Sequence, residues 1–125
     1  MDKTRRCFTL LELITVVIIM GILASIAFPV FTKTKEEVLN KEAKANLKLI
    51  QAAEKIYKME LGVYCASSDI DTINPSLKLD LTGQNWSYSA DTTGTGTATR
   101  AGRTWTLYIS NPDEPICSPS SNCPP

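Results

Sequence analysis

The carboxylate inside the long apolar stretch of this sequence is Glu12. The residues from Leu13 to Thr32 carry no charge, and as a helix rising about 1.5 Å per residue they would cross the roughly 30 Å hydrocarbon core of a bilayer. A carboxylate in such a segment costs about 3 kcal/mol on insertion scales unless it is neutralised or paired. The segment offers no partner, so we expect one in another molecule: an α-amino group formed by cutting the chain just ahead of Phe8. The alternative is that Glu12 lies among the lipid headgroups and has no role.

Groups that support catalysis are missing from the rest of the sequence. Histidine is absent, so the commonest catalytic base is missing. We find no nucleophile elbow, no phosphate-binding glycine loop and no pair of buried-looking carboxylates. Beyond Cys7 the chain carries ten basic and twelve acidic residues, which gives no footprint for nucleic acid. We therefore predict no catalytic residue, no enzyme activity and no nucleic-acid partner.

Acidic residues in the connector are the metal-ligand candidates. Asp69, Asp71 and Asp80 carry oxygen ligands of the kind that calcium prefers, but they lack the ligand density and the turn glycine of a calcium loop. We predict a solvated loop, no metal ligands and no cofactor, with calcium as the weaker alternative.

The four cysteines are placed unevenly along the chain: Cys7, Cys65, Cys117 and Cys123. Basic residues ahead of the apolar run predict that the N-terminus stays in the cytoplasm. The last three cysteines would then lie in an oxidising compartment, where at most one pair forms within the chain. Cys117 and Cys123 are the nearer pair in sequence, and Cys65 competes for either.

The apolar run continues into an amphipathic helix. Pro29 removes one backbone donor and predicts a kink or a meltable stretch near residues 25 to 29. Beyond it, apolar residues recur every three or four positions, as on a helix with one buried face: Leu39, Ala43, Leu47, Ile50, Ala53, Tyr57 and Leu61. On the opposite face, Glu37 and Glu54 are spaced to pair with Lys41 and Lys58. Gly62 is expected to cap a helix that runs from Phe8 to Leu61.

The last half of the chain predicts a small antiparallel sheet. A polar connector has a short helical turn near Ile70 and Ile73, then alternating segments follow: 77–81, as a strand or an extended loop edge, 86–89, and 104–109 as the strongest strand. Three or four strands would cover the apolar face of the helix, giving an α+β fold with one small domain. The expected core is Trp86, Tyr88, Trp105 and Leu107. Residues 111–125 are rich in proline and are predicted not to pair regularly in the sheet.

The N-terminal residues, RRCFTLLELITVVIIMGILASIAFP, resemble those of the type IV pilins and the type II secretion pseudopilins. That family has a short basic leader, a new N-terminal Phe, a Glu at its fifth position and a Pro at its twenty-second. Counting from Phe8 places Glu12 fifth and Pro29 twenty-second. The resemblance covers about 25 positions at set spacings. One departure is Cys7, since the family usually has Gly before the cut.

The resemblance implies a leader of residues 1–7, a membrane and filament-core helix of 8–32, its amphipathic continuation in 33–62, and a region of 63–125 with the connector, sheet and disulfide-containing tail. It further implies cleavage between Cys7 and Phe8 by a prepilin peptidase, N-methylation of Phe8, and assembly that involves Glu12 and Pro29. The precursor would be a single-pass protein of the bacterial inner membrane. An assembly platform and an ATPase would add it to an extracellular or periplasmic filament of identical subunits.

Three readings stay open on this basis. The first is a structural subunit of a type IV pilus-like filament, and the second is a type II secretion pseudopilin. The third is a membrane-anchored binding domain that never polymerises. The resemblance also gives a second calcium alternative at Asp113 and Glu114, because some pseudopilins hold calcium near their C-terminal strands.

Overall fold

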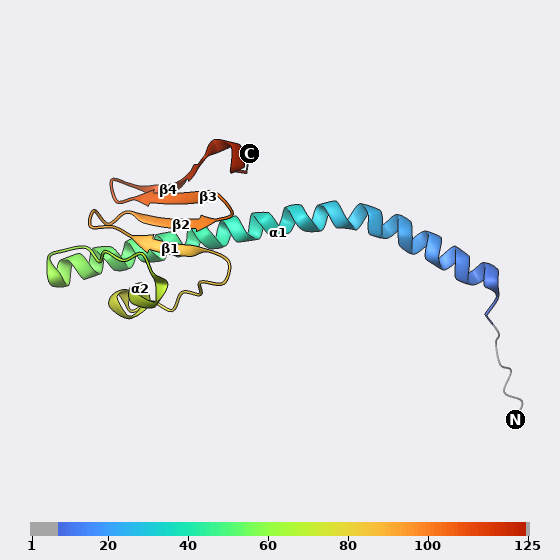
Figure 1. Cartoon of the computed structure of the whole chain (residues 1–125), viewed down its shortest axis with the longest axis horizontal. Coiled ribbons are helices and arrows are strands. Elements are labelled where there is room, and N and C mark those ends of the chain that lie inside the picture. Colours follow the sequence, from blue (N-terminus) through green and yellow to red (C-terminus); the bar gives the residue numbers. More distant parts are fainter. Residues whose placement is uncertain (1–7, 125) are drawn as a thin grey trace, which may run out of the picture. The chain divides into compact units, whose positions relative to one another are not determined.

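The computed structural model describes residues 8–124 and divides the chain after Glu36 into two compact units, which are described separately below. Cys7 and the predicted leader lie outside the described residues. Two helices and four strands follow one another along the chain (Figure 1): α1 Leu10–Leu61, α2 Ile70–Leu77, β1 Ser87–Ala90, β2 Gly96–Arg100, β3 Arg103–Tyr108 and β4 Asn111–Ser118, with a 3₁₀ turn at Ser120–Asn122. The α+β fold predicted from the sequence is confirmed.

The first unit contains the N-terminal part of α1. Thr9 caps the helix: its hydroxyl accepts a hydrogen bond from the Glu12 N–H at 3.2 Å, and its carbonyl accepts one from the Leu13 N–H. The helix therefore starts at Leu10, two residues later than predicted. It passes through Pro29 without interruption, so the predicted meltable stretch stays a prediction.

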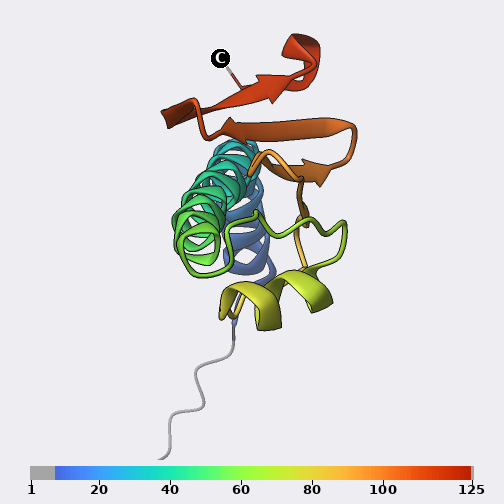
Figure 2. The ribbon, with the colours of Figure 1, turned by 90° about the vertical axis from the view of Figure 1, so that its left-hand side faces the viewer.

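In the second unit, residues 37–61 of α1 lie against one face of the sheet, with α2 beside the same helix (Figure 2). Apolar side chains from the helix and the sheet share one buried core that includes Leu47, Ile50, Trp86, Tyr88, Trp105 and Leu107. The predicted core residues are confirmed. The helix ends at Leu61, and Gly62 follows with a φ of 78°, as its predicted capping role requires.

The sheet is an antiparallel meander in the order β1-β2-β3-β4. A two-residue turn at Ala101 and Gly102 joins β2 to β3, where Arg100 pairs with Arg103. This turn keeps consecutive strands in register, so that alternate residues such as Ala98, Trp105 and Leu107 face the core.

The proline-rich C-terminal segment was predicted not to pair regularly in the sheet; its first part does join the sheet, with an irregular register. Residues Asn111–Ser118 form β4, which pairs with β3 at the edge of the sheet. Cys117 and Ser118 of β4 pair regularly with β3. The register then shifts between Thr106 and Tyr108 of β3, so the β4 residues between Asn111 and Ile116 lie in a bulge. Both prolines of the strand, Pro112 and Pro115, fall there. An edge strand with a bulge tolerates a residue without an N–H.

The connector is more ordered than a single helical turn. α2 has eight residues, and the Asn74 side chain holds the chain beyond it by accepting from the Leu81 N–H and donating to the Leu81 carbonyl, each at 2.9 Å. Leu77, Leu79 and Leu81 still turn toward the core. Leu77 is the last residue of α2, and Leu79 and Leu81 lie in an extended loop edge, so segment 77–81 does not form a strand.

Candidate functional site

Glu12 lies in the first turn of α1, at the third helical position after the Thr9 cap. The first turn of a helix favours a negative charge, because the backbone N–H groups there have no partner within the helix. Lys41 and Glu37 form a salt bridge at 3.0 Å, whereas Glu12 forms no ion pair within residues 8–124. Its carboxylate therefore remains available for a partner outside the described chain.

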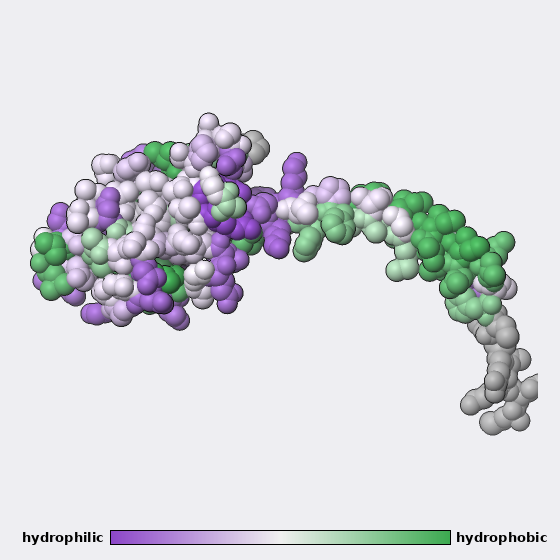
Figure 3. Space-filling model, in the orientation of Figure 1, coloured by the Kyte–Doolittle hydropathy of each residue, from purple (hydrophilic) through white to green (hydrophobic). Residues whose placement is uncertain are grey.

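Large apolar side chains surround Glu12 along the first unit and are exposed to solvent, from Phe8 at 74% to Phe31 at 70%. Figure 3 shows this apolar surface as the green part of the helix that begins next to the grey residues. In the part of the chain that the structure describes, α1 is the helix long and apolar enough to cross a membrane. A surface of this kind is stable only in lipid or against other protein chains.

A second apolar surface lies on the second unit, where α1 forms an open groove of about 340 Å³ with the end of α2 and the two residues after it. Its lining is mostly aliphatic: Leu49, Ala52, Ala53, Ile56, Tyr57, Glu60 and residues 76–79. Leu49 and Ile56 are about half exposed, at 51% and 54%. This surface was not predicted from the sequence, although Leu49, Ala52, Ile56 and Met59 repeat at helical spacing on a face next to the buried one.

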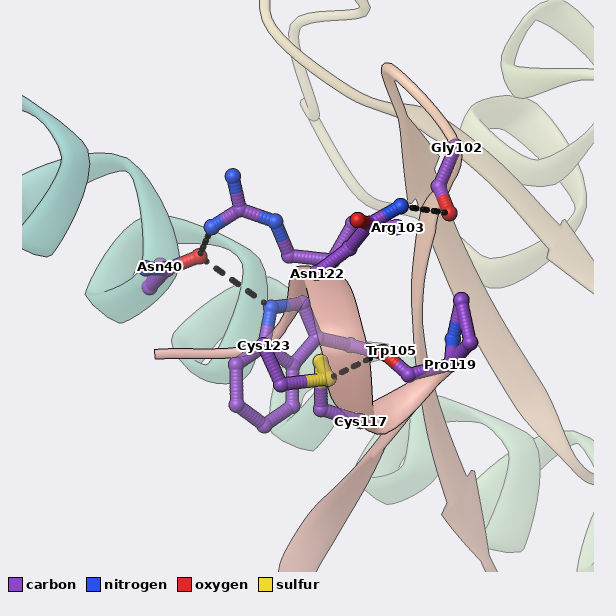
Figure 4. Close-up of a disulfide and its surroundings, with 8 residues drawn as sticks. All are labelled: Asn40, Gly102, Arg103, Trp105, Cys117, Pro119, Asn122 and Cys123. Atoms are coloured by element: carbon purple, nitrogen blue, oxygen red, sulfur yellow. Dashed lines mark hydrogen bonds between the residues drawn. A yellow bond between two sulfur atoms is a disulfide. The ribbon is translucent and has the colours of Figure 1, made fainter. Parts of the chain in front are cut away.

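The C-terminal cysteines form a disulfide between Cys117 and Cys123, and Cys65 is a buried free thiol. Figure 4 shows how residues around this disulfide connect the end of the chain to the sheet, and the sheet to α1. The Asn122 amide donates to the Gly102 carbonyl at 3.3 Å. Nearby, the side-chain oxygen Oδ1 of Asn40 on α1 accepts hydrogen bonds from the Arg103 guanidinium at 2.8 Å and from the Trp105 ring N–H at 3.3 Å.

Glu54 is placed differently from the prediction. Instead of pairing with Lys58 in solvent, it is fully buried and accepts a hydrogen bond from the Cys65 N–H at 2.9 Å. Lys58 lies over the ring of Tyr64, 4.2 Å from its centre. The sequence did contain a signal, because Glu54 continues the buried spacing of Leu47 and Ile50 by seven and four residues. Leu61, predicted on the buried stripe, is 60% exposed.

The acidic residues considered as calcium ligands do not come together. Within residues 8–124, no group of three or more acidic, cysteine or histidine side chains is placed to hold a metal ion. Asp69, Asp71, Asp80, Asp113 and Glu114 are all exposed.

The N-terminal motif and two curated relatives connect the chain to known proteins. Residues 3–28 match the family described as a prokaryotic N-terminal methylation motif. The chain is 48% identical to the type IV major pilin protein PilA of Myxococcus xanthus (strain DK1622) over 63 residues, which is 50% of this chain and 29% of that protein. It is 31% identical to the type II secretion system core protein G of Dickeya chrysanthemi over 64 residues, which is 51% of this chain and 42% of that protein.

The matched regions thus span less than half the length of either curated relative. No solved structure is significantly similar to the chain. The motif match includes Glu12 and ends at Phe28, directly before Pro29. The resemblance found in the sequence is confirmed: the chain carries the prepilin-type N-terminal methylation motif and is homologous to the type IV pilins and the type II secretion pseudopilins.

Proposed function

We propose that the chain is a structural, non-enzymatic subunit of a type IV pilus-like filament. The proposal rests on one observation: the chain combines a prepilin-type motif with an apolar helix segment whose large side chains are exposed. The precursor waits in the bacterial inner membrane, with residues beyond the apolar segment outside the cytoplasm. A prepilin peptidase cuts between Cys7 and Phe8, and Phe8 is then N-methylated.

Glu12 then pairs with the α-amino group of Phe8 on a neighbouring copy. A carboxylate and an ammonium group attract each other strongly where water is excluded, and the loss of either partner leaves an uncompensated buried charge. The pair therefore selects an incoming subunit that has been cleaved, because an uncleaved chain has an amide at Phe8. An assembly platform and its ATPase supply the work of moving the segment out of lipid.

The groove beside α2 supports the same proposal. Leu49 and Ile56 are exposed apolar side chains on a helix half that lies outside the apolar segment, so lipid does not cover them. A second copy of the chain is the partner we assign to this surface, because its charge-free segment offers apolar side chains along a full helix. Covering both surfaces at once stabilises the filament by removing apolar area from water.

The test is Glu12→Ala in the full chain, with Glu37→Ala as the matched control on the same helix. We expect Glu12→Ala to leave the precursor stable and cleaved, as read by mass spectrometry, while surface filaments vanish from electron micrographs. Glu37→Ala removes an exposed carboxylate and should leave filaments unchanged. Normal filaments from the Glu12→Ala protein would overturn the assembly role of this residue.

A pseudopilin of type II secretion is the second candidate function, favoured by the similarity to core protein G. Its subunits would assemble in the periplasm instead of at the cell surface. A deletion strain distinguishes the two, because the loss of a pseudopilin stops protein secretion and leaves surface pili in place. An uncut N-terminus in the mature protein would contradict both candidates and favour an anchored domain that does not polymerise.

A further inference from the structure

A buried carboxylate, Glu54, joins the end of α1 to the connector that follows it. Its side chain is fully buried, and one oxygen accepts the Cys65 N–H at 2.9 Å. The other oxygen, Oε1, is also buried and has no hydrogen-bond partner among residues 8–124. A buried ionised carboxylate with one free oxygen is costly, whereas the protonated form costs far less to bury.

The connector is held to the sheet at the next step along the chain. Ser67 and Ala90 exchange two backbone hydrogen bonds, at 2.9 Å and 2.7 Å, so the segment that Glu54 holds is also attached to the end of β1. Directly after Ala90, Asp91 begins the turn between β1 and β2. Its side chain accepts hydrogen bonds from the N–H groups of Thr93 and Thr95. The clip, as we call it, consists of Glu54, the connector of residues 62–67, and the turn of residues 91–95.

Gly94 shows how tightly this clip is closed. Its φ is 79°, and a side chain there would collide with Ile109 and with the ring of Tyr64. The turn therefore packs directly on the connector at Tyr64. The remaining ionisable groups of the clip are Asp91 from the turn, and Cys65 and Tyr64 from the connector. On α1 itself, Lys58 has its ammonium group over the Tyr64 ring.

We propose that Glu54 makes this clip proton-sensitive: the connector is held closed while the carboxyl group is protonated, and is loosened when the group ionises. Among residues 8–124 no cation pairs with Glu54, so its ionised form places a second negative charge near that of Asp91. Opening the clip lets water reach that charge. The device is independent of filament assembly and of the function proposed above.

The surroundings shift the pKa values of the two carboxyl groups of the clip in opposite directions. Burial raises the pKa of Glu54, the Cys65 N–H opposes this rise in part, and the charge of Asp91 adds to it. Partial burial acts to raise the pKa of Asp91 as well, but hydrogen bonds from Thr93 and Thr95 bring it below its usual value. There is thus a pH range in which Asp91 is charged and Glu54 holds its proton.

The direction of the pH dependence follows from this difference. Because the folded chain holds the Glu54 proton more tightly than the unfolded chain, the stabilisation is complete below the ordinary pKa of a glutamate, about 4.3. It is lost as the pH rises through the raised pKa of the folded state. The clip is therefore expected to open on the alkaline side and to close again on acidification.

Cys65 provides a probe of opening, because it is buried in the clip and is a free thiol. The experiment measures its alkylation by iodoacetamide in the full chain in detergent, with Cys7→Ser in every sample so that Cys65 is the reactive thiol. The reference is Glu54→Gln, which keeps an acceptor oxygen for the Cys65 N–H and cannot ionise. The ratio of the rates with Glu54 and with Gln at each pH cancels the pH dependence of the thiol itself.

We expect this ratio to be constant in acid and to rise by up to tenfold per pH unit between the ordinary pKa of a glutamate and the raised pKa of folded Glu54, because opening releases a proton in that range. Above the raised pKa the ratio should level off, because the carboxyl group is then ionised in both the closed and the open clip. Circular dichroism at each pH separates opening of the clip from global unfolding. A ratio that does not change with pH overturns the proposal.

Asp91→Asn gives a second reading that does not depend on the folding of the Glu54 variant. It keeps an acceptor for Thr93 and Thr95 while removing the charge that raises the pKa of Glu54. We expect the rise of the ratio to be smaller in this variant and to level off at a lower pH, because the folded-state pKa of Glu54 moves toward its ordinary value. Asp69→Asn, at an exposed carboxylate just beyond the clip, should leave the rise unchanged. An unchanged transition in Asp91→Asn would contradict a role for the charge pair.

Discussion

The two parts of α1 differ in what their apolar side chains contact. In residues 37–61 one face is buried under the sheet, whereas in the first unit the large apolar side chains are exposed on every side. The second part is stabilised by packing within its own domain. The first part depends on surroundings that the single chain does not supply. One continuous helix thus combines a folded domain with a segment made for contact with lipid or other copies.

A matched pair of leucines tests this comparison with the largest expected effect. Leu47 is fully buried, and Leu23 is 62% exposed in the apolar segment. Leu47→Ala should destabilise the second unit by about 3 kcal/mol, because it removes buried methyl groups and leaves a cavity. Leu23→Ala should change the free energy of unfolding by less than about 0.5 kcal/mol. Chemical denaturation in detergent, followed by tryptophan fluorescence, measures both; equal losses would contradict the division of the helix.

The disulfide gives the next largest effect, again confined to the second unit. Replacing Cys117 and Cys123 together by serine frees a short loop of the unfolded chain and should cost about 2 kcal/mol on the chain-entropy account. The same denaturation experiment measures the loss. A matched double change at Ser118 and Ser121 to alanine, which leaves the bridge in place, should have little effect.

The smallest effect is expected at the start of the first unit. Thr9→Ala removes the hydroxyl that caps α1 and should weaken the first turn by about 1 kcal/mol without changing the stability of the sheet domain. Amide exchange at Glu12 measures it, because that N–H loses its partner. Thr34→Ala is the control, since its hydroxyl bonds to the Val30 carbonyl inside the helix and caps nothing. If both variants exchange alike at Glu12, Thr9 is not the cap.

Much of the fold could be read from periodicity. The stripe through Leu39, Ala43, Leu47 and Ile50 identified the buried face, since helix spacing depends on neighbours three and four residues apart. The alternation around Trp86 and Trp105 identified the sheet face in the same way.

Three features escaped this kind of reasoning because they depend on distant contacts. Glu54 looked like half of a surface ion pair, and its burial depends on a connector that returns to the helix eleven residues later. The prolines of β4 predicted that this segment would not pair regularly, and the bulge opposite Leu107 that accommodates them could not be read from the sequence. The groove beside α2 is formed jointly by Leu79 and by residues of α1, which are far from Leu79 in the sequence. The candidate assembly residue, in contrast, is a local motif, and local spacing was sufficient to find it.

The prolines of β4 have a consequence for a chain that is proposed to pack at high density with its own copies. An open sheet edge is a template on which another chain can add a strand, and crowding identical domains side by side favours that reaction. Here the outer edge carries Pro112 and Pro115, which lack N–H groups, together with an irregular register. This edge of the sheet is therefore protected against the addition of another strand. Association is left to the helix, where the geometry of neighbours is set by side chains and not by backbone pairing.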